Sequence, residues 1–409
     1  MASTVEAKRV KGEAVKANPP ILTCFNHKGG VGKTTNSHMI MWGLLEKGLQ
    51  PLVVDFDPQC NISWSTLNVQ MAPTEKWTTF VENRHLLTTS HLFSTRPIPS
   101  DRVIATPLKT SKSAVKFVVA TEDLLGDTED FDRTIGYAIA TPALFNNLAF
   151  LYNNIMKIAE DEKCDVILFD ISPSFSATNK FLLAISSFLV TPCAVDCFSE
   201  NALETLIDRI PTLTSLGERP PSDTVARLIY NNMDQMRGMT KLKLTYLGHV
   251  FNNYLNVNRG LPPAVQTARM NLIEALSRAL AEHLNDPPPA VGVKLELSRF
   301  TDYTSVKNNA QILTVPVAFM NNSLATFSME VDPMLGIKVD TERDRFQGWR
   351  ENLRTICSRI IDAMGVEPPK EVLKIRLVFI PVFPGGSRPI TEDDIEHIRH
   401  KVNRISNLL

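Results

Sequence analysis

Residues 25 to 35 have the composition of a phosphate-binding loop: Phe-Asn-His-Lys-Gly-Gly-Val-Gly-Lys-Thr-Thr. Closely spaced glycines let backbone N–H groups converge on an anion, and a helix that begins there directs its positive end to the same point. In such a loop Lys33 lies against the β- and γ-phosphates, and the Thr34 hydroxyl ligates Mg²⁺. The sequence therefore predicts a site for ATP and Mg²⁺. The predicted nucleotide-binding residues of the loop are Lys28, Gly29, Gly30, Val31, Gly32, Lys33, Thr34 and Thr35.

Carboxylates follow two apolar segments further along the chain. Residues 51–54 precede Asp55 and Asp57, and residues 166–169 precede Asp170. In a parallel α/β sheet, ligands bind beyond the carboxyl ends of the strands, where these acids would stand. An acid at the end of a buried strand can hold a metal-bound water opposite Thr34. Asp170 is therefore predicted to form the metal site with Thr34.

Strand-length apolar segments that alternate with helical patterns must position these residues. Residues 21–25 predict a strand before the loop, and residues 37–46 predict a helix after it. This order predicts an α/β fold, a mostly parallel P-loop NTPase sheet with helices on both faces, over residues 21–365. Short helices and loops are expected at 60–113. Further strands are expected at 51–56, 115–120, 164–170, 188–192, 226–230 and 312–317, and further helices at 142–160, 198–204, 265–284 and 346–364.

Three segments are expected to stand apart from this pattern. Residues 1–20 are polar and basic and predict a disordered tail, which could also contact DNA or lipid. Residues 248–292 are interpreted as an insertion that could offer a partner surface. Residues 366–409 are interpreted as a C-terminal extension, with a strand at 375–380 and a helix from Thr391.

The last helix has an apolar face and several basic residues. Packing, partner binding, membrane contact and DNA contact are all compatible with that composition. The acids at 392–394 favour a packed helix, because acids stabilise a helix N-terminus. The apolar face consists of Ile395, Ile398, Val402 and Ile405.

Composition narrows the class of protein. The 409 residues include 43 basic and 44 acidic side chains, so the formal charge of -1 gives no net attraction to nucleic acid. The 6 cysteines are scattered without a C-x-x-C pair, which indicates reduced core cysteines. No apolar run approaches the roughly 18 residues of a membrane span, and the N-terminus lacks the pattern of a signal peptide. We expect a soluble, cytoplasmic protein.

The phosphate-binding loop departs from the common template G-x-x-x-x-G-K-[ST], because His27 replaces the first glycine and Lys28 adds a second lysine. The form K-G-G-x-G-K-T resembles the deviant Walker A motif of the ParA/MinD family of ATPases, and is most similar to ParA. The resemblance implies that Lys28 reaches across a homodimer interface to the phosphates bound by the partner subunit. The D-x-D-P-Q element implies that Asp57 orients the attacking water and that Asp55 belongs to the metal site. The expected catalytic residues are Lys28, Lys33 and Asp57.

The resemblance is looser elsewhere in the chain. Relatives hold the adenine with a polar residue at a strand end, which implies a base contact for Asn231. Residues 295–317 are similar to the final loop and strand of the family, where Arg299 and Lys307 could contact nucleotide or DNA. Residues 171–175 match only part of the loop that senses the γ-phosphate.

The function that the resemblance implies is a switch whose output is assembly. ATP would be part of the homodimer interface, and hydrolysis would release the dimer. Such an ATPase partitions plasmid or chromosomal DNA, or positions a cargo on the nucleoid. It binds DNA nonspecifically, and a ParB-like protein or cargo adaptor stimulates its slow hydrolysis.

Three alternatives remain open. One is a MinD-like ATPase that cycles on membranes through its C-terminal helix. Another is a metabolic or metallocluster relative of the same fold, although no cysteine pair has the required spacing. The third is a scaffold that binds ATP to dimerise without hydrolysing it.

Overall fold

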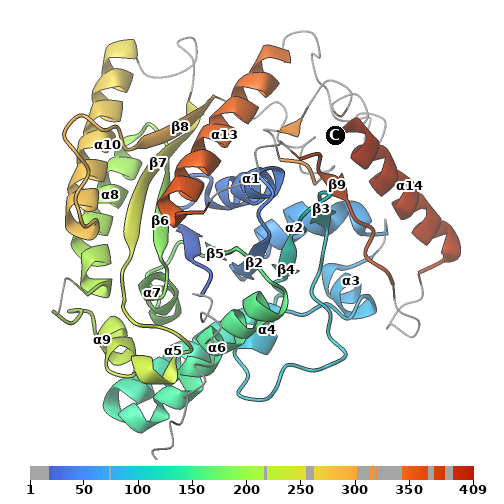
Figure 1. Cartoon of the computed structure of the whole chain (residues 1–409), viewed down its shortest axis with the longest axis horizontal. Coiled ribbons are helices and arrows are strands. Elements are labelled where there is room, and N and C mark those ends of the chain that lie inside the picture. The colour runs from blue at the N-terminus through green and yellow to red at the C-terminus, as the bar shows by residue number, and fades with distance from the viewer. Residues whose placement is uncertain are drawn as a thin grey trace, which may run out of the picture.

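The computed structural model describes residues 18–72, 75–215, 219–254, 262–301, 314–316, 319–320, 324, 343–366, 373–382 and 390–409. Its main sheet consists of β1 (Ile21–Cys24), β2 (Pro51–Phe56), β4 (Lys116–Val118), β5 (Val166–Ile171), β6 (Phe188–Cys193), β7 (Thr245–Tyr254) and β8 (Glu296–Thr301). The strand order is β4-β2-β5-β1-β6-β7-β8 (Figure 1). All paired neighbours run parallel, so their carboxyl ends lie at one edge. This confirms the predicted parallel α/β sheet.

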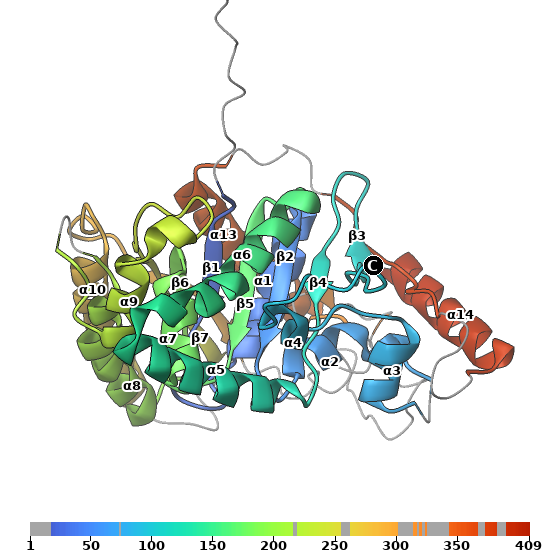
Figure 2. The same cartoon turned by 90° about the horizontal axis from the view of Figure 1, so that it is seen from below.

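Buried apolar side chains alternate between the two faces of the sheet. In β5, Val166 and Leu168 join one buried cluster, whereas Ile167 and Phe169 join the other. Helices α1 (Lys33–Glu46) and α13 (Arg343–Met364) cover the first face. The second face is covered by α5 (Leu124–Ala140), α6 (Asn146–Asp161), α7 (Ala177–Ala184), α8 (Cys197–Arg209), α9 (Thr224–Tyr230) and α10 (Pro263–Leu284) (Figure 2). The expected helices on both faces are therefore present.

The segment between β2 and β4 forms short elements, as expected. They are α2 (Asn61–Leu67), α3 (Trp77–Asn83), α4 (Thr89–Leu92) and β3 (Leu108–Lys109). The C-terminal extension packs against this segment: β9 (Arg376–Leu377) pairs antiparallel with β3, and Ile380 N donates to Gln70 Oε1 over 2.7 Å.

The last helix, α14 (Glu392–Leu408), begins at the capping residue Thr391. Ile398, Val402 and Ile405 are buried on one of its faces, in the same apolar cluster as α1 and α13. This apolar face is thus part of the folded core. In the described part of the chain, no helix has the length and hydropathy needed to cross a bilayer.

Two predictions about residues 226–292 are wrong. Residues 226–230 lie in helix α9 and not in a strand, because the Asp223 side chain caps that helix by accepting from Val225 N and Ala226 N. The strand beside β6 is β7 instead. Residues 248–292 are therefore no insertion, since they include most of β7 and all of α10, which packs on β7 and α8.

Other differences are smaller. Residues 296–301, expected in a loop, form the edge strand β8, and α5 was not predicted. The basic residues of the N-terminal tail, Lys307 and half of the expected strand 312–317 lie outside the described residues.

Candidate nucleotide-binding site

The loop between β1 and α1 has the backbone geometry that its glycines allow. Gly30 and Gly32 have φ angles of 74° and 89°, which residues other than glycine rarely adopt. A Cβ added at Gly29 or Gly30 would meet no atom within 4 Å, so space for a ligand is open beside the backbone there. The amide and side-chain nitrogens of Asn36 both donate to the Gly32 carbonyl, over 2.9 and 2.8 Å, and fix the start of α1.

Asn252 holds the phosphate-binding loop against the sheet. It lies near the carboxyl end of β7, and its Nδ2 donates to the Val31 carbonyl over 2.9 Å. A Cβ at Gly32 would stand 2.9 Å from the same Nδ2. Glycine is therefore required at position 32 both by the φ angle and by the contact with β7.

Lys33 lies inside the phosphate-binding loop of residues 25–35, which we call the cradle. Its side chain is 8% exposed, and its Nζ donates to the Lys28 carbonyl over 3.0 Å. Burial lowers the pKa of Lys33, and the nearby charges of Asp170 and Asp57 partly oppose that effect. The hydrogen bond that this ammonium donates goes to a neutral carbonyl, and the phosphate oxygens of a nucleotide would be stronger, charged acceptors.

Three carboxylates meet at the carboxyl edge beside this lysine. The register of β2 against β5 places Asp55 next to Asp170, and Asp57 follows at the end of β2. Their exposed fractions are 0%, 1% and 7% for Asp55, Asp170 and Asp57. Burial, reinforced by Asp170, raises the pKa of Asp55 well above its usual value.

The oxygens of Asp55 and Asp170 differ in how they are used. Asp55 accepts from the Ser63 hydroxyl over 2.6 Å, from Ser63 N and from Asp57 N. Asp170 accepts from the Ser37 hydroxyl over 2.8 Å, whereas its buried Oδ2 has no hydrogen-bond partner among the residues that the structure describes. Burial raises the pKa of Asp170 to about 6, against the opposing effect of the Ser37 and Thr34 hydroxyls.

These features fit a nucleotide with Mg²⁺. The unpartnered Asp170 oxygen lies near Thr34 and can accept from a metal-bound water, which is how Mg²⁺ is usually held beside phosphates. Asp55 is already engaged by the chain, so it is suited to holding the strand ends and not to direct ligation. The predicted metal-site residues Thr34, Asp55 and Asp170 thus lie at the same edge of the sheet. Thr34 and Asp170 are suited to holding the metal, and Asp55 to supporting them.

The Lys28 side chain contacts residues at the start of α8. Its Nζ lies 2.5 Å from an Asp196 carboxylate oxygen and 5.4 Å from the centroid of the Phe198 ring. Asp196 is the N-cap of α8, and it also accepts from Ser199 N over 2.8 Å. Lys28 and the other hydrogen bonds lower the pKa of Asp196, although partial burial acts in the opposite direction. The two lysines of the loop therefore have different contacts: Lys33 binds within the loop, and Lys28 binds at the start of α8.

The structure does not support the reasoning that placed Asn231 at the base. Asn231 caps the C-terminus of α9, so it does not follow a strand of the sheet. Arg299 lies on β8 and pairs with Glu296. Sequence reasoning missed four site residues: Ser37, Ser63, Asp196 and Asn252. All but Ser63 have partners that are distant in the chain.

Comparisons with known proteins agree with this fold. Residues 20–218 match a family described as an AAA domain. The uncharacterized protein MJECL24 of Methanocaldococcus jannaschii is 24% identical over 238 residues, which cover 57% of this chain and 81% of that protein. The solved structure of protein DIP2308 from Corynebacterium diphtheriae has 20% identity and a TM-score of 0.52, over 72% of this chain and 97% of that chain. A structure of pNOB8 ParA bound to nonspecific DNA has 17% identity and a TM-score of 0.48, over 84% and 99%.

The family match and the site lead to the same class. The K-G-G-x-G-K-T loop lies on a parallel sheet within the matched residues. Residues 20–218 thus carry a phosphate-binding loop on a P-loop NTPase sheet, and this loop resembles the deviant Walker A motif of the ParA/MinD family.

Proposed function

We propose that this protein is a ParA-like ATPase that dimerises on Mg-ATP and is released by hydrolysis. The observation that carries the proposal is the divergence of the two loop lysines. Lys33 is buried in the cradle, while the partly exposed Lys28 extends towards α8. A cation in that position can reach phosphates on a second copy, and it has no role at its own cradle in the described geometry.

The residues of the cradle would divide the work as follows. The backbone N–H groups of residues 29–33 and the Lys33 ammonium bind the β- and γ-phosphates. Thr34 and Asp170 are the residues that would hold Mg²⁺, which when bound neutralises charge on the phosphate oxygens. Asp57 orients the attacking water, and Asp55 fixes the strand ends through Ser63. Hydrolysis then depends mainly on positioning and on charge stabilisation.

The output of this cycle would be assembly on DNA. We infer nonspecific DNA as a partner, together with a ParB-like protein or cargo adaptor that stimulates hydrolysis. The support is the K-G-G-x-G-K-T loop, which resembles the deviant Walker A motif of the ParA/MinD family. The cellular role would be partition of plasmid or chromosomal DNA, or positioning of a cargo on the nucleoid.

Light scattering tests the switch. The protein is run at one concentration without nucleotide, with Mg-ADP and with Mg-ATP, and phosphate release is followed in parallel. We expect a monomer mass without nucleotide and with ADP, and a dimer mass with ATP. A monomer under all three conditions contradicts the proposal. An ATP dimer without phosphate release supports the scaffold alternative instead.

A further inference from the structure

A small two-stranded ribbon joins the C-terminal extension to the ATPase domain. In it Leu108 pairs with Leu377, and Lys109 pairs with Arg376. The two leucines are buried, so the alternation along each strand turns Lys109 and Arg376 to solvent. Lys374, two residues before Arg376, is exposed as well. We call Lys109, Lys374 and Arg376 the cationic ribbon face.

The positive charges of Lys109 and Arg376 repel each other across the ribbon. Like charges on directly opposite strand positions destabilise a pair of strands. Among the described residues, no carboxylate forms an ion pair with Lys109, Lys374 or Arg376. The nearby Lys116, by contrast, pairs with Glu162 over 2.7 Å. The ribbon therefore presents cations without a counterion from the described part of the fold.

The ribbon lies at the amino edge of the sheet, away from the nucleotide site. Ala114 N donates to the Gln50 side chain just before β2, and Leu373 N donates to the Glu46 carbonyl at the end of α1. Figure 2 shows β3 and β4 at the side of the molecule that carries α14.

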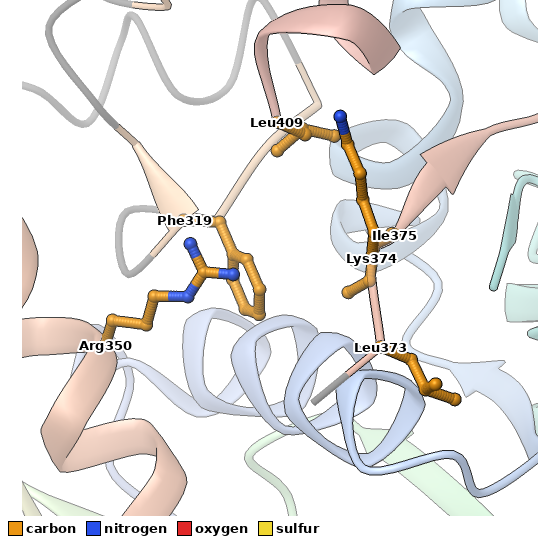
Figure 3. A pocket seen from close by; sticks show the side chains of 6 residues that line it. All are labelled: Phe319, Arg350, Leu373, Lys374, Ile375 and Leu409. Atoms are coloured by element: carbon orange, nitrogen blue, oxygen red, sulfur yellow. The ribbon is translucent and has the colours of Figure 1, made fainter. Parts of the chain in front are cut away.

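A cavity adjoins the ribbon. It has a volume of about 230 Å³ and is lined by Arg350, Lys374 and Leu409 among others (Figure 3). Arg350 also pairs with Glu46 over 2.8 Å, so Lys374 is the cation of this lining that the described carboxylates leave available. The cavity thus extends the positive surface towards the end of α1.

We propose that the cationic ribbon face binds the phosphate backbone of DNA. Side chains two residues apart on a strand are about 6.6 Å apart, and cross-strand neighbours are about 5 Å apart. Lys and Arg side chains are long and flexible, so three cations at this spacing can contact neighbouring phosphates of one duplex. A membrane fits less well, because interfacial binding needs apolar side chains, and the ribbon leucines and the apolar face of α14 are buried. The inference rests on the proposed function, since it names the surface for that function's DNA partner.

Alanine variants test the surface. Binding of wild type, Lys109→Ala, Arg376→Ala and the double variant to a fluorescent random-sequence duplex is measured with Mg-ATP at several salt concentrations. Each lost phosphate contact lowers the slope of log affinity against log salt by about 0.9, which is about an eightfold loss at 0.1 M salt. We expect this loss for each single variant and about a sixtyfold loss for the double. Arg376→Lys keeps the charge and should bind like wild type.

The controls separate the inference from the proposed function. Lys294 is an exposed lysine beside β8, at the other end of the sheet, so Lys294→Ala should leave affinity and slope unchanged. All variants should keep ATP-dependent dimerisation and phosphate release, which shows that they are folded. If wild type binds DNA and the double variant binds equally well, the ribbon face is wrong and the proposed function stands. If ATP-loaded wild type binds no DNA, the DNA part of the proposed function fails as well. Binding to anionic vesicles that depends on Lys109 and Arg376, without DNA binding, would assign the face to lipid.

Discussion

Lys28 Nζ lies 2.5 Å from an Asp196 carboxylate oxygen, and this ion pair ties the phosphate-binding loop to the first turn of α8. Both side chains are partly exposed, with 23% and 37% of their surface accessible. An ion pair of this kind contributes at most about 1 kcal/mol, because water screens it. The contact can therefore hold Lys28 in the monomer and still be exchanged for a stronger one with phosphate.

Lys28→Ala should abolish the ATP-dependent dimer and leave nucleotide binding close to wild type. Removing one partner of a buried charged contact at an interface costs about 2–5 kcal/mol of affinity. Light scattering with Mg-ATP and titration with a fluorescent ATP analogue measure the two effects. Asp196→Asn is the matched control, because it removes the charge and keeps an oxygen to cap α8. It should still dimerise, and loss of the dimer in this variant too would mean that the pair is structural.

Asp57→Ala should bind ATP and remain trapped as the ATP dimer. Without a group to orient the attacking water, phosphate release should fall by roughly 10²-fold or more. Lys33→Ala serves as the contrast, since it should lose ATP binding altogether. Single-turnover hydrolysis with labelled ATP distinguishes the two variants. Wild-type turnover in Asp57→Ala would remove Asp57 from the mechanism.

Gly32→Ala should destabilise the protein even without nucleotide. A left-handed backbone and a Cβ placed 2.9 Å from Asn252 Nδ2 together cost about 1–3 kcal/mol of unfolding free energy. Urea unfolding followed by circular dichroism measures the change. Gly29→Ala is the matched control, because a Cβ there meets no atom within 4 Å, and the change should be within about 0.5 kcal/mol. Equal stabilities of the two variants would contradict the role assigned to Asn252.

The part of the site that sequence could predict is the part carried by local spacing. Asp55, Asp57 and Asp170 follow or interrupt short apolar runs, Lys33 ends the glycine-rich loop after another, and a parallel sheet must bring such positions to one edge. Ser37 also follows the loop, but nothing in its spacing indicates that it donates to Asp170. Asp196 and Asn252 act through contacts across 168 and 221 residues, which no local pattern encodes.

The errors in the fold also have local causes. Residues 226–230 include Leu, Ile and Tyr, which are common in strands, but the N-cap at Asp223 stabilises a helix there. The strand β7 was missed because Gly248, with a φ of 137°, and His249 interrupt its apolar pattern. The last helix was predicted well, since its apolar period and the capping box of Thr391 and Asp394 both lie within one short segment.

Ile398→Ala should lower the free energy of unfolding by about 2–5 kcal/mol, because the side chain is 1% exposed in the core. The exposed neighbour His397→Ala should change it by less than about 0.5 kcal/mol. Sedimentation with anionic vesicles in Mg-ATP should show no binding that depends on Ile398. A variant of native stability that loses ATP-dependent vesicle binding would instead favour the MinD-like alternative.

His249 should make the protein less stable in acid. It is buried on β7, its Nδ1 is 2.9 Å from the Ser277 hydroxyl, and burial lowers its pKa to about 3. The unfolded chain takes up a proton at this residue below about pH 6.5, whereas the folded chain stays neutral until about pH 3. Stability is therefore full above pH 6.5 and falls as the pH drops towards 3, because the unfolded state binds more protons in that window.

The change that His249 contributes between pH 7.5 and 5.5 is about 1.4 kcal/mol. Asp55 and Asp170, whose pKa values are raised by burial, act in the opposite sense, since the folded chain binds the extra proton there. The total pH dependence of wild type is thus a sum, and the informative quantity is the difference between wild type and His249→Gln. Urea unfolding at the two pH values should show that this variant loses about 1.4 kcal/mol less on acidification. The control His283→Gln, at an exposed position, should lose as much unfolding free energy on acidification as wild type. If His249→Gln also loses as much as wild type, His249 is protonated in the folded protein.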